Sequence, residues 1–400
     1  MWLYNLGISL YAGGIRLAAL WHGKARLWSE GRRNIFERME AAVRPSDRIV
    51  WVHAASLGEF EQARPIIERL RAEHPEYKIL LTFFSPSGYE IRKNYEGADY
   101  VFYLPADTPS NARRFLDIVH PEIAIFIKYE FWINLLSELR RRKVRSYIVS
   151  AIFRRNSVFF RPYGAMWRQA LETFDTLFVQ NVESKRLLSE IGFDNVVVAG
   201  DTRFDRVAQI AAAAQRVETI ERFRGGGRLF VAGSTWGPDE EILLPLVNAN
   251  PDVKFVIAPH EMDEGRIAHL MRNAKGGAVR YTQCDAATRF DDVQVLVLDT
   301  MGMLSSVYGS ATWAYVGGGF GVGIHNTLEA ATFGLPIAFG PNYGKFKEAR
   351  DMVSLGCAVS VRTAGELAAW FAPLCDDEET LRRASRTAKD YTARNQGATG

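Results

Sequence analysis

The chain has 400 residues, of which 48% are hydrophobic and 24% charged, values typical of a globular protein with two domains. This composition excludes collagen-like, intrinsically disordered and disulfide-framed proteins. The net charge of +3 is too small to indicate nucleic acid as a partner. Three widely spaced cysteines, without a Cys/His cluster, indicate a reducing compartment and no structural zinc. We expect Cys284, Cys357 and Cys375 to be buried apolar side chains rather than catalytic nucleophiles.

Residues 1–30 predict a segment that associates with a membrane. Residues 1–21 are apolar and carry one charge, Arg16, and residues 22–39 carry five basic side chains. An apolar stretch about as long as a bilayer core is thick, followed by basic residues, favours attachment to an anionic lipid surface. Two different interpretations stay open. One is a secretory signal peptide, which the poor cleavage site disfavours, and the second is an amphipathic helix packed on the protein itself.

From residue 49 onwards, short apolar runs alternate with longer amphipathic stretches, which predicts parallel sheets with helices on both faces. The first series of strand-like runs lies at 49–55, 79–84, 100–105, 123–128, 146–151, 176–181 and 196–200. A second series follows at 228–234, 254–260, 293–299, 313–319 and 335–341. We therefore predict an α/β protein with two Rossmann-like doubly wound domains facing a cleft.

The connection between the two series sets the expected domain boundary. A helical stretch is followed by three glycines, residues 225–227, a composition suited to an interdomain connection. We place the boundary near residues 215–225, with a first domain at 31–215 and a second at 222–400. The last helix is a candidate to pack back on the first domain.

The segment HAASLGEFEQARPII, residues 53–67, places a carboxylate at the end of a buried strand. Gly58 permits a tight turn, and Glu59 then lies at the carboxyl edge of the sheet, where it is suited to take a proton from an attacking hydroxyl. The alternative is that Glu59 only stabilises the positive end of a helix. Pro65 makes the start of that helix uncertain.

A glycine-rich segment at 317–341 predicts a phosphate-binding turn in the second domain. Its glycines let the backbone approach a ligand, and the following helix start supplies N–H groups. Asn326 and Glu329 are three residues apart and share a helix face, where the carboxylate is suited to accept hydrogen bonds from ribose hydroxyls. We interpret His325 as a structural hydrogen-bonding residue.

Further polar residues follow the predicted strands. The loops at 233–241, 258–261 and 299–304 together predict a nucleotide pocket at one sheet edge. In the first domain, Lys128 and Glu130 lie at the expected cleft edge, either as a solvated ion pair of little consequence or as an acceptor contact. Arg203 and Asp205 carry the same ambiguity.

Taken together, these segments resemble the Kdo transferase family, which adds 3-deoxy-D-manno-octulosonic acid (Kdo) to lipid A precursors. The matching segments are HAASLGEFEQARPII, KYEFWIN, VQNVESKRLLSEIGF, VAGDTRFDRV, GSTWGPDEE, MGMLSSVYGSA and VGGGFGVGIHNTLEAATFGLPIAFGPNYGKF. They keep the family's order over nearly the whole chain. The resemblance implies a GT-B fold, with the acceptor on the first domain and CMP-Kdo on the second. It also implies work at the cytoplasmic face of the cell inner membrane.

The resemblance assigns roles to individual residues. The catalytic glutamate falls on Glu59 and the second acidic residue on Glu130. The donor contacts fall on Ser234, His260, Met301, Gly302, Met303, Asn326 and Glu329, and the acceptor contacts are expected at Ser56, Gly58, Lys128 and Arg203. The chain departs from the family at His260, where arginine is frequent, at Met303, where glutamate is frequent, and at Lys128, where an acidic residue is frequent.

The implied reaction is a single displacement that inverts the anomeric carbon of Kdo, with Glu59 as base and CMP as leaving group. We expect no metal ligand and no cofactor, because the nucleotide loops hold no acidic metal-binding motif. The nearest competing hypothesis is a GT-B transferase that uses a UDP-sugar on a lipid-linked acceptor. Two more hypotheses stay open, a nucleotide-binding protein without transfer activity and a nucleotide-sugar epimerase.

Overall fold

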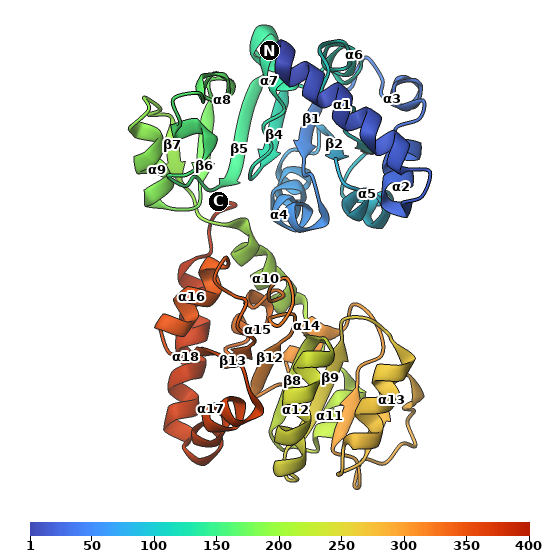
Figure 1. Cartoon of the computed structure of the whole chain (residues 1–400), viewed down its shortest axis with the longest axis vertical. Coiled ribbons are helices and arrows are strands. Elements are labelled where there is room, and N and C mark those ends of the chain that lie inside the picture. The colour runs from blue at the N-terminus through green and yellow to red at the C-terminus, as the bar shows by residue number, and fades with distance from the viewer. The chain divides into compact units, whose positions relative to one another are not determined.

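The computed structural model describes residues 1–400 and divides into two compact units. Unit 1 holds residues 1–206 and 397–400, and unit 2 holds residues 207–396. Each unit contains one seven-stranded sheet in which all strand pairs are parallel. Helices flank each sheet in both units (Figure 1). This arrangement confirms the predicted α/β class with two Rossmann-like doubly wound sheets.

The sheet of unit 1 has the order β3-β2-β1-β4-β5-β6-β7. Its strands are β1 (Ile49–His53), β2 (Lys78–Phe83), β3 (Tyr100–Tyr103), β4 (Ile123–Ile127), β5 (Arg145–Ala151), β6 (Thr176–Val179) and β7 (Val196–Val198). Alternate residues of β1 enter two separate cores, because successive side chains of a strand point to opposite faces. Trp51 packs among the helices of one face, and Val50 and Val52 pack against α4 on the other. The order reverses between β1 and β4, which makes their carboxyl ends the ligand-binding edge expected of this fold.

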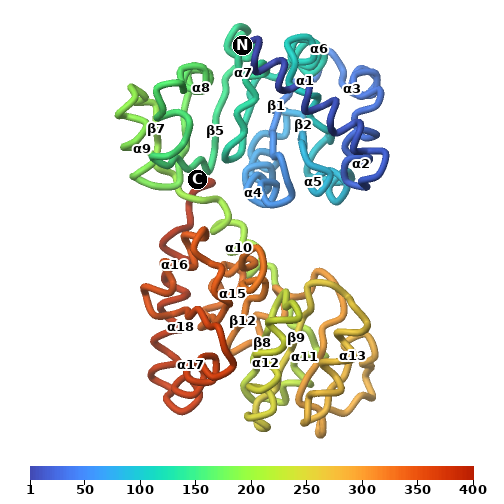
Figure 2. The backbone as a smooth tube through the Cα atoms, viewed as in Figure 1, coloured from blue at the N-terminus to red at the C-terminus, as the bar shows by residue number.

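The helices of unit 1 follow the strands along the chain, as the tube in Figure 2 traces. They are α1 (Trp2–Ala18), α2 (Gly23–Gly31), α3 (Ile35–Ala42), α4 (Leu57–Glu73), α5 (Pro86–Arg92), α6 (Pro109–Val119), α7 (Ile133–Arg142), η1 (Val158–Phe160), α8 (Ala165–Leu171), α9 (Val182–Ser189) and α10 (Thr202–Ala213), which runs into unit 2. The structure settles the start of α4 at Leu57, with Pro65 inside the helix.

The sheet of unit 2 has the order β10-β11-β9-β8-β12-β13-β14. Its strands are β8 (Leu229–Thr235), β9 (Lys254–Pro259), β10 (Ala278–Arg280), β11 (Val295–Val297), β12 (Trp313–Val316), β13 (Ile337–Phe339) and β14 (Ala358–Ser360). Its helices are α11 (Glu218–Arg224), α12 (Gly237–Ala249), α13 (Glu264–Asn273), η2 (Tyr281–Gln283), α14 (Leu304–Tyr308), α15 (Leu328–Ala331), α16 (Lys347–Ser354), α17 (Ala364–Asp376) and α18 (Glu378–Arg394). Strands β10 and β14 were not predicted, because each has only two apolar residues beside a polar one, Arg280 or Ser360.

The division between the units falls at Arg206, before the expected residues 215–225. Arg206 is held in unit 1 by Glu61, at 3.0 Å. The three glycines are not the interdomain connection, because Gly225 ends α11, whose Phe223 is buried in the core of unit 2. The last helix, α18, also packs in unit 2, through Ala388. Of the residues that follow α18, those at 397–400 belong to unit 1.

The N-terminal helix α1 packs on unit 1 by one face and exposes apolar side chains on the other. Tyr4 donates a hydrogen bond to Asp107 (2.7 Å), and the ring of Tyr11 stacks on Phe84. Leu3, Leu6, Leu10, Leu17 and Leu20 are between 46% and 71% exposed. None of the helices has both the length and the apolar character needed to cross a bilayer.

Candidate functional site

The carboxylate of Glu59 is held at the start of α4 by a local hydrogen-bond pair. One oxygen, Oε2, accepts hydrogen bonds from the backbone N–H and the Oγ–H of Ser56, each at 2.8 Å. This is the capping-box arrangement, in which the third helical residue bonds back to the residue that precedes the helix. The other oxygen, Oε1, makes no hydrogen bond within the protein, so a fixed carboxylate keeps one oxygen for a ligand. Glu59 therefore does cap the helix, as the alternative interpretation proposed, and its Oε1 stays available to accept a proton.

The second acidic residue, Glu130, belongs to a buried polar network at the ends of β1 and β4. Its Oε2 accepts a hydrogen bond from the indole N–H of Trp132 (2.8 Å) and lies 3.1 Å from Nε2 of His53. His53 is fully buried, and its Nδ1 lies 2.8 Å from Oγ1 of Thr82. That hydroxyl accepts a hydrogen bond from Trp51 (2.8 Å), which leaves its own proton for Nδ1 of His53. Nε2 then carries the imidazole proton and donates it to the carboxylate.

The supporting residues of this network were not predicted from the sequence. His53 is the first residue of the HAASLGEF segment, and a histidine at the end of an otherwise apolar strand was the available signal. Trp132 lies two residues after Glu130, in KYEFWIN. The bond between Trp132 and Glu130 depends on the turn after β4, which the sequence pattern does not specify.

The residues expected to contact the acceptor lie at three places in unit 1. Ser56 and Gly58 flank the first turn of α4, beside Glu59, and Gly58 is exposed. Lys128 follows β4 with a left-handed φ of 64°. Arg203 forms an ion pair with Asp201 (2.8 Å), a carboxylate that is 6% exposed.

Arg203 therefore forms an ion pair, but with Asp201 and not with the expected Asp205. Burial raises the pKa of Asp201, but the Arg203 guanidinium, a backbone N–H and Gln62 together outweigh burial and lower it. Asp205 has a different partner from the expected one, since its carboxylate accepts hydrogen bonds from the backbone N–H groups of Gly397 and Thr399.

In unit 2, a buried carboxylate fixes the glycine-rich segment that follows β12. Asp239, in the first turn of α12, accepts hydrogen bonds from the N–H of Gly318 (2.9 Å), the hydroxyl of Tyr315 (2.8 Å) and the N–H of Trp236 (2.9 Å). The chain after β12 also approaches β8 closely. A side chain at Gly317 would lie 2.2 Å from the carbonyl oxygen of Ser234, so this position requires glycine.

Beside this segment is a pocket of about 440 Å³. Its lining residues come from the ends of β8, β9 and β12, and they include Trp236, Asp239, His260, Phe320 and His325. The His260 ring stacks on Trp236, at 4.8 Å between ring centres, and on His325, at 4.3 Å. Burial, and then the neighbouring His260, lower the pKa of His325 to about 4. His325 is therefore neutral at pH 7, and its Nε2 accepts a hydrogen bond from Trp236 (3.2 Å).

Of the remaining predicted donor residues, Asn326 contacts Glu329 directly. Its two carboxylate oxygens accept hydrogen bonds from the side chains of Asn326 (3.0 Å) and Ser305 (3.1 Å). Ser305 lies in α14, which begins directly after Met303, whereas Met301 is 78% exposed.

One expectation about this region was wrong. Asn326 precedes α15 rather than lying on it, and α15 itself is a single turn of four residues. The chain turns at Gly334, with a φ of 76°, and so the helix does not continue. Hydrogen bonding, not a shared helix face, brings Asn326 and Glu329 together.

Comparisons with known proteins agree with this architecture. Residues 32–206 match the family described as 3-deoxy-D-manno-octulosonic-acid transferase (kdotransferase). The 3-deoxy-D-manno-octulosonic acid transferase of Haemophilus influenzae is 25% identical over 373 residues, which cover 88% of this chain and 85% of the relative. The enzyme of that name from Bordetella pertussis is 28% identical over 366 residues, with the same coverage of both chains.

Among solved structures, a UDP-GlcNAc 2-epimerase from Neisseria meningitidis superimposes with a TM-score of 0.60. It is 15% identical, and the superposition covers 88% of this chain and 96% of the epimerase. At this identity the likeness shows the fold alone. The two doubly wound units and this likeness define the fold, which is GT-B. The sequence relatives then identify the enzyme class, a glycosyltransferase: the chain is similar to named Kdo transferases over most of both chains, and residues 32–206 match the family model.

Proposed function

We propose that the chain transfers Kdo from CMP-Kdo to a lipid A precursor, with inversion at the anomeric carbon. The observation that carries this proposal is the alignment with named Kdo transferases over most of both chains. The matched region includes Glu59, whose geometry suits a base.

The reaction follows from the position of this carboxylate. The acceptor hydroxyl oxygen attacks the anomeric carbon of Kdo, and its proton passes to Oε1 of Glu59, the oxygen that α4 does not use. The bond from the anomeric carbon to the phosphate oxygen breaks, and CMP leaves with the electron pair. Because CMP is a good leaving group, a modest base is sufficient for the proton transfer.

Glu130 has a supporting role in this proposal. Hydrogen bonds from His53 and Trp132 fix its orientation and stabilise its charge, as expected for a side chain that must hold a sugar hydroxyl in one position. The acceptor-binding roles of Ser56, Gly58, Lys128 and Arg203 also belong to this proposal.

The donor is assigned to unit 2. The pocket at Trp236, His260 and His325 and the polar cluster around Glu329 supply an aromatic surface and hydrogen-bond acceptors for ribose hydroxyls. His260 stands where an arginine is frequent in the family, so backbone N–H groups of residues 318–323 are assigned a larger share of phosphate binding.

A donor comparison tests the assignment. Calorimetric titration is expected to show CMP binding at least tenfold tighter than UDP binding, and CMP-Kdo alone should yield a glycosylated lipid. Tighter UDP binding, with transfer from a UDP-sugar, would replace the proposal with a UDP-sugar transferase of the same fold. Transfer from preformed CMP-Kdo is expected to persist in EDTA.

We also propose attachment to the cytoplasmic face of the cell inner membrane. The exposed leucines of α1, followed by basic residues, form an apolar surface beside positive charge, the pattern of a helix that lies in a lipid interface. The substitutions Leu10→Asp and Leu17→Asp are expected to release the protein from anionic vesicles. Unchanged sedimentation of this double variant with vesicles would contradict the proposal.

A further inference from the structure

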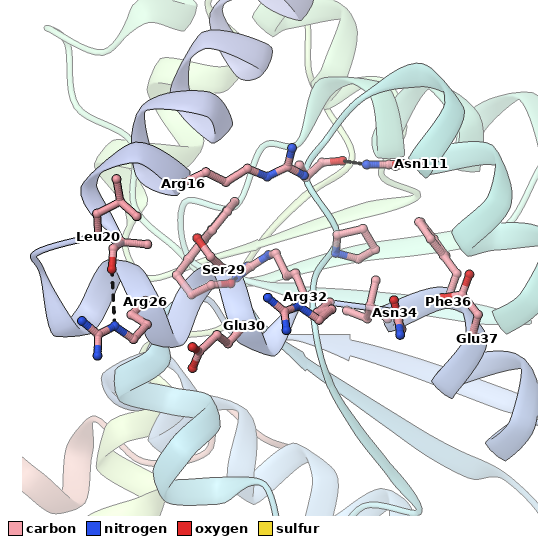
Figure 3. A pocket seen from close by; sticks show the side chains of 16 residues that line it. Arg16, Leu20, Arg26, Ser29, Glu30, Arg32, Asn34, Phe36, Glu37 and Asn111 are labelled. Carbon is pink, nitrogen blue, oxygen red and sulfur yellow. Dashed lines mark hydrogen bonds between the residues drawn. The ribbon is translucent and has the colours of Figure 1, made fainter.

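A second large pocket lies in unit 1, and none of the predicted site residues lines it. It has a volume of about 770 Å³ and lies between the end of α1, helix α2, the start of α3 and the turn after β3. Figure 3 shows Arg16 extending from α1 along one side of this pocket. Leu20 and Arg26 lie at one end, and Phe36 and Glu37 lie at the other.

The lining of this pocket is positively charged. Four arginines and two glutamates line it, an excess of two positive charges; these are Arg16, Arg26, Arg32, Arg33, Glu30 and Glu37. Arg16 and Arg33 make no side-chain hydrogen bond or ion pair within the protein. Glu37 is partly neutralised by Arg114, at 3.3 Å. The pocket therefore presents guanidinium groups that have no anionic partner.

Arg32 is the most unusual of these side chains, because it is a largely buried cation without a carboxylate. Its guanidinium donates hydrogen bonds to the carbonyl oxygens of Leu104 (2.8 Å), Trp28 (3.1 Å) and Phe84 (2.8 Å). It also lies over the ring of Trp28, 3.9 Å from the ring centre. Burial lowers its pKa to about 9. An anion in the pocket would stabilise this buried charge.

Two further polar groups on the pocket wall lack partners. The indole N–H of Trp28, a residue only 5% exposed, and the hydroxyl of Ser29 are buried without a hydrogen bond. Both groups are donors. Unpaired buried polar groups are rare in native structures, so these two mark a pocket wall whose donors the protein itself does not satisfy.

Apolar surface adjoins the pocket. Leu20 lines it, and the exposed leucines of α1 lie on the same segment. We propose that this pocket binds the phosphomonoester headgroup of a membrane lipid, with Arg16 and Arg33 as phosphate ligands and the acyl chains along α1. A phosphomonoester carries up to two negative charges, which matches the charge of the lining, and the volume leaves room for an attached glycerol or sugar. The inference rests on the membrane association proposed above.

The test is sedimentation of the full-length protein with phosphatidylcholine vesicles that contain either phosphatidic acid or phosphatidylglycerol at equal surface charge. Wild type is expected to bind phosphatidic acid vesicles more tightly, because only that lipid offers a phosphomonoester. The double variant Arg16→Gln/Arg33→Gln is expected to lose this preference, with binding on the order of 20-fold weaker, at about fivefold per arginine. The single variant Arg16→Gln should fall between them.

The matched control is Lys24→Gln/Arg38→Gln, which removes the same charge from the same segment but leaves the pocket lining intact. It should lower binding to both vesicles equally and keep the preference. Equal effects of the two double variants would overturn the proposal, because diffuse attraction would then explain the binding. Saturable binding of glycerol 3-phosphate, without a preference for phosphatidic acid vesicles, would assign the pocket to a soluble phosphate instead. No donor or acceptor is present, so the result is independent of the transferase activity.

Discussion

Two substitutions of Glu59 separate its structural role from its proposed catalytic role. The carboxylate accepts two hydrogen bonds from Ser56 with one oxygen and leaves the other oxygen open. Glutamine keeps an acceptor oxygen for the capping box but cannot take a proton, whereas alanine removes both functions. The free energy of unfolding of Glu59→Gln should therefore change by less than about 0.5 kcal/mol, and that of Glu59→Ala should fall by about 1 kcal/mol.

Activity should follow a different order from stability. Both variants should lose roughly 10²–10⁴-fold in kcat, the usual contribution of a general base, which corresponds to about 3–5 kcal/mol in the barrier. Transfer is measured with saturating donor and acceptor, and stability by urea unfolding. Thr363, which caps α17 in unit 2, supplies the control, because Thr363→Ala should lose similar stability and keep full activity. If Glu59→Gln were as active as wild type while Glu59→Ala was not, Glu59 would be a helix cap and not the base.

Three more predictions concern the network around Glu130 and the pocket of unit 2. Trp132→Phe removes the N–H that bonds Glu130 at 2.8 Å but keeps an aromatic ring packed on Phe84. The substitution should lower kcat/KM for the acceptor about tenfold and leave CMP affinity unchanged. Unchanged acceptor kinetics would exclude a positioning role for Trp132. Asp239→Asn leaves at least one of three buried donors unpaired; urea unfolding should show a loss of about 1–3 kcal/mol, with weaker CMP binding by calorimetry. His325 has a folded pKa lowered from 6.5 to about 4, so the unfolded chain takes up its proton first and stability is lost as the pH falls from 6.5 towards 4. His325→Gln should therefore lose less stability than wild type between pH 7 and pH 5, and an equal loss in the two proteins would count against this assignment.

The strand-rich parts of the fold were predictable from the sequence, because buried parallel strands are continuous apolar runs. All twelve predicted strands are present, and the two that were missed, β10 and β14, each combine only two apolar residues with a polar one. The domain boundary was displaced because glycines were interpreted as a linker, whereas Gly225 ends a helix. Local composition does not reveal which core a helix joins.

The candidate site was predictable only where a short motif sets the geometry. Ser56 and Glu59 are three residues apart, and that spacing is enough to form the capping box. The contact between His53 and Glu130 joins residues 77 positions apart and depends on the pairing of β1 with β4. The stack of Trp236, His260 and His325 likewise joins the ends of separate strands, and no local pattern encodes it.

The most direct test of the proposed reaction is transfer from CMP-Kdo, generated in situ, to a tetra-acylated lipid A precursor, read by mass spectrometry. We expect the lipid to gain the mass of one or more Kdo residues with the wild-type chain, and we expect this product to form roughly 10²–10⁴-fold more slowly with Glu59→Gln. A folded wild-type protein that binds CMP but adds no Kdo to the lipid would contradict the assigned acceptor and the proposed reaction.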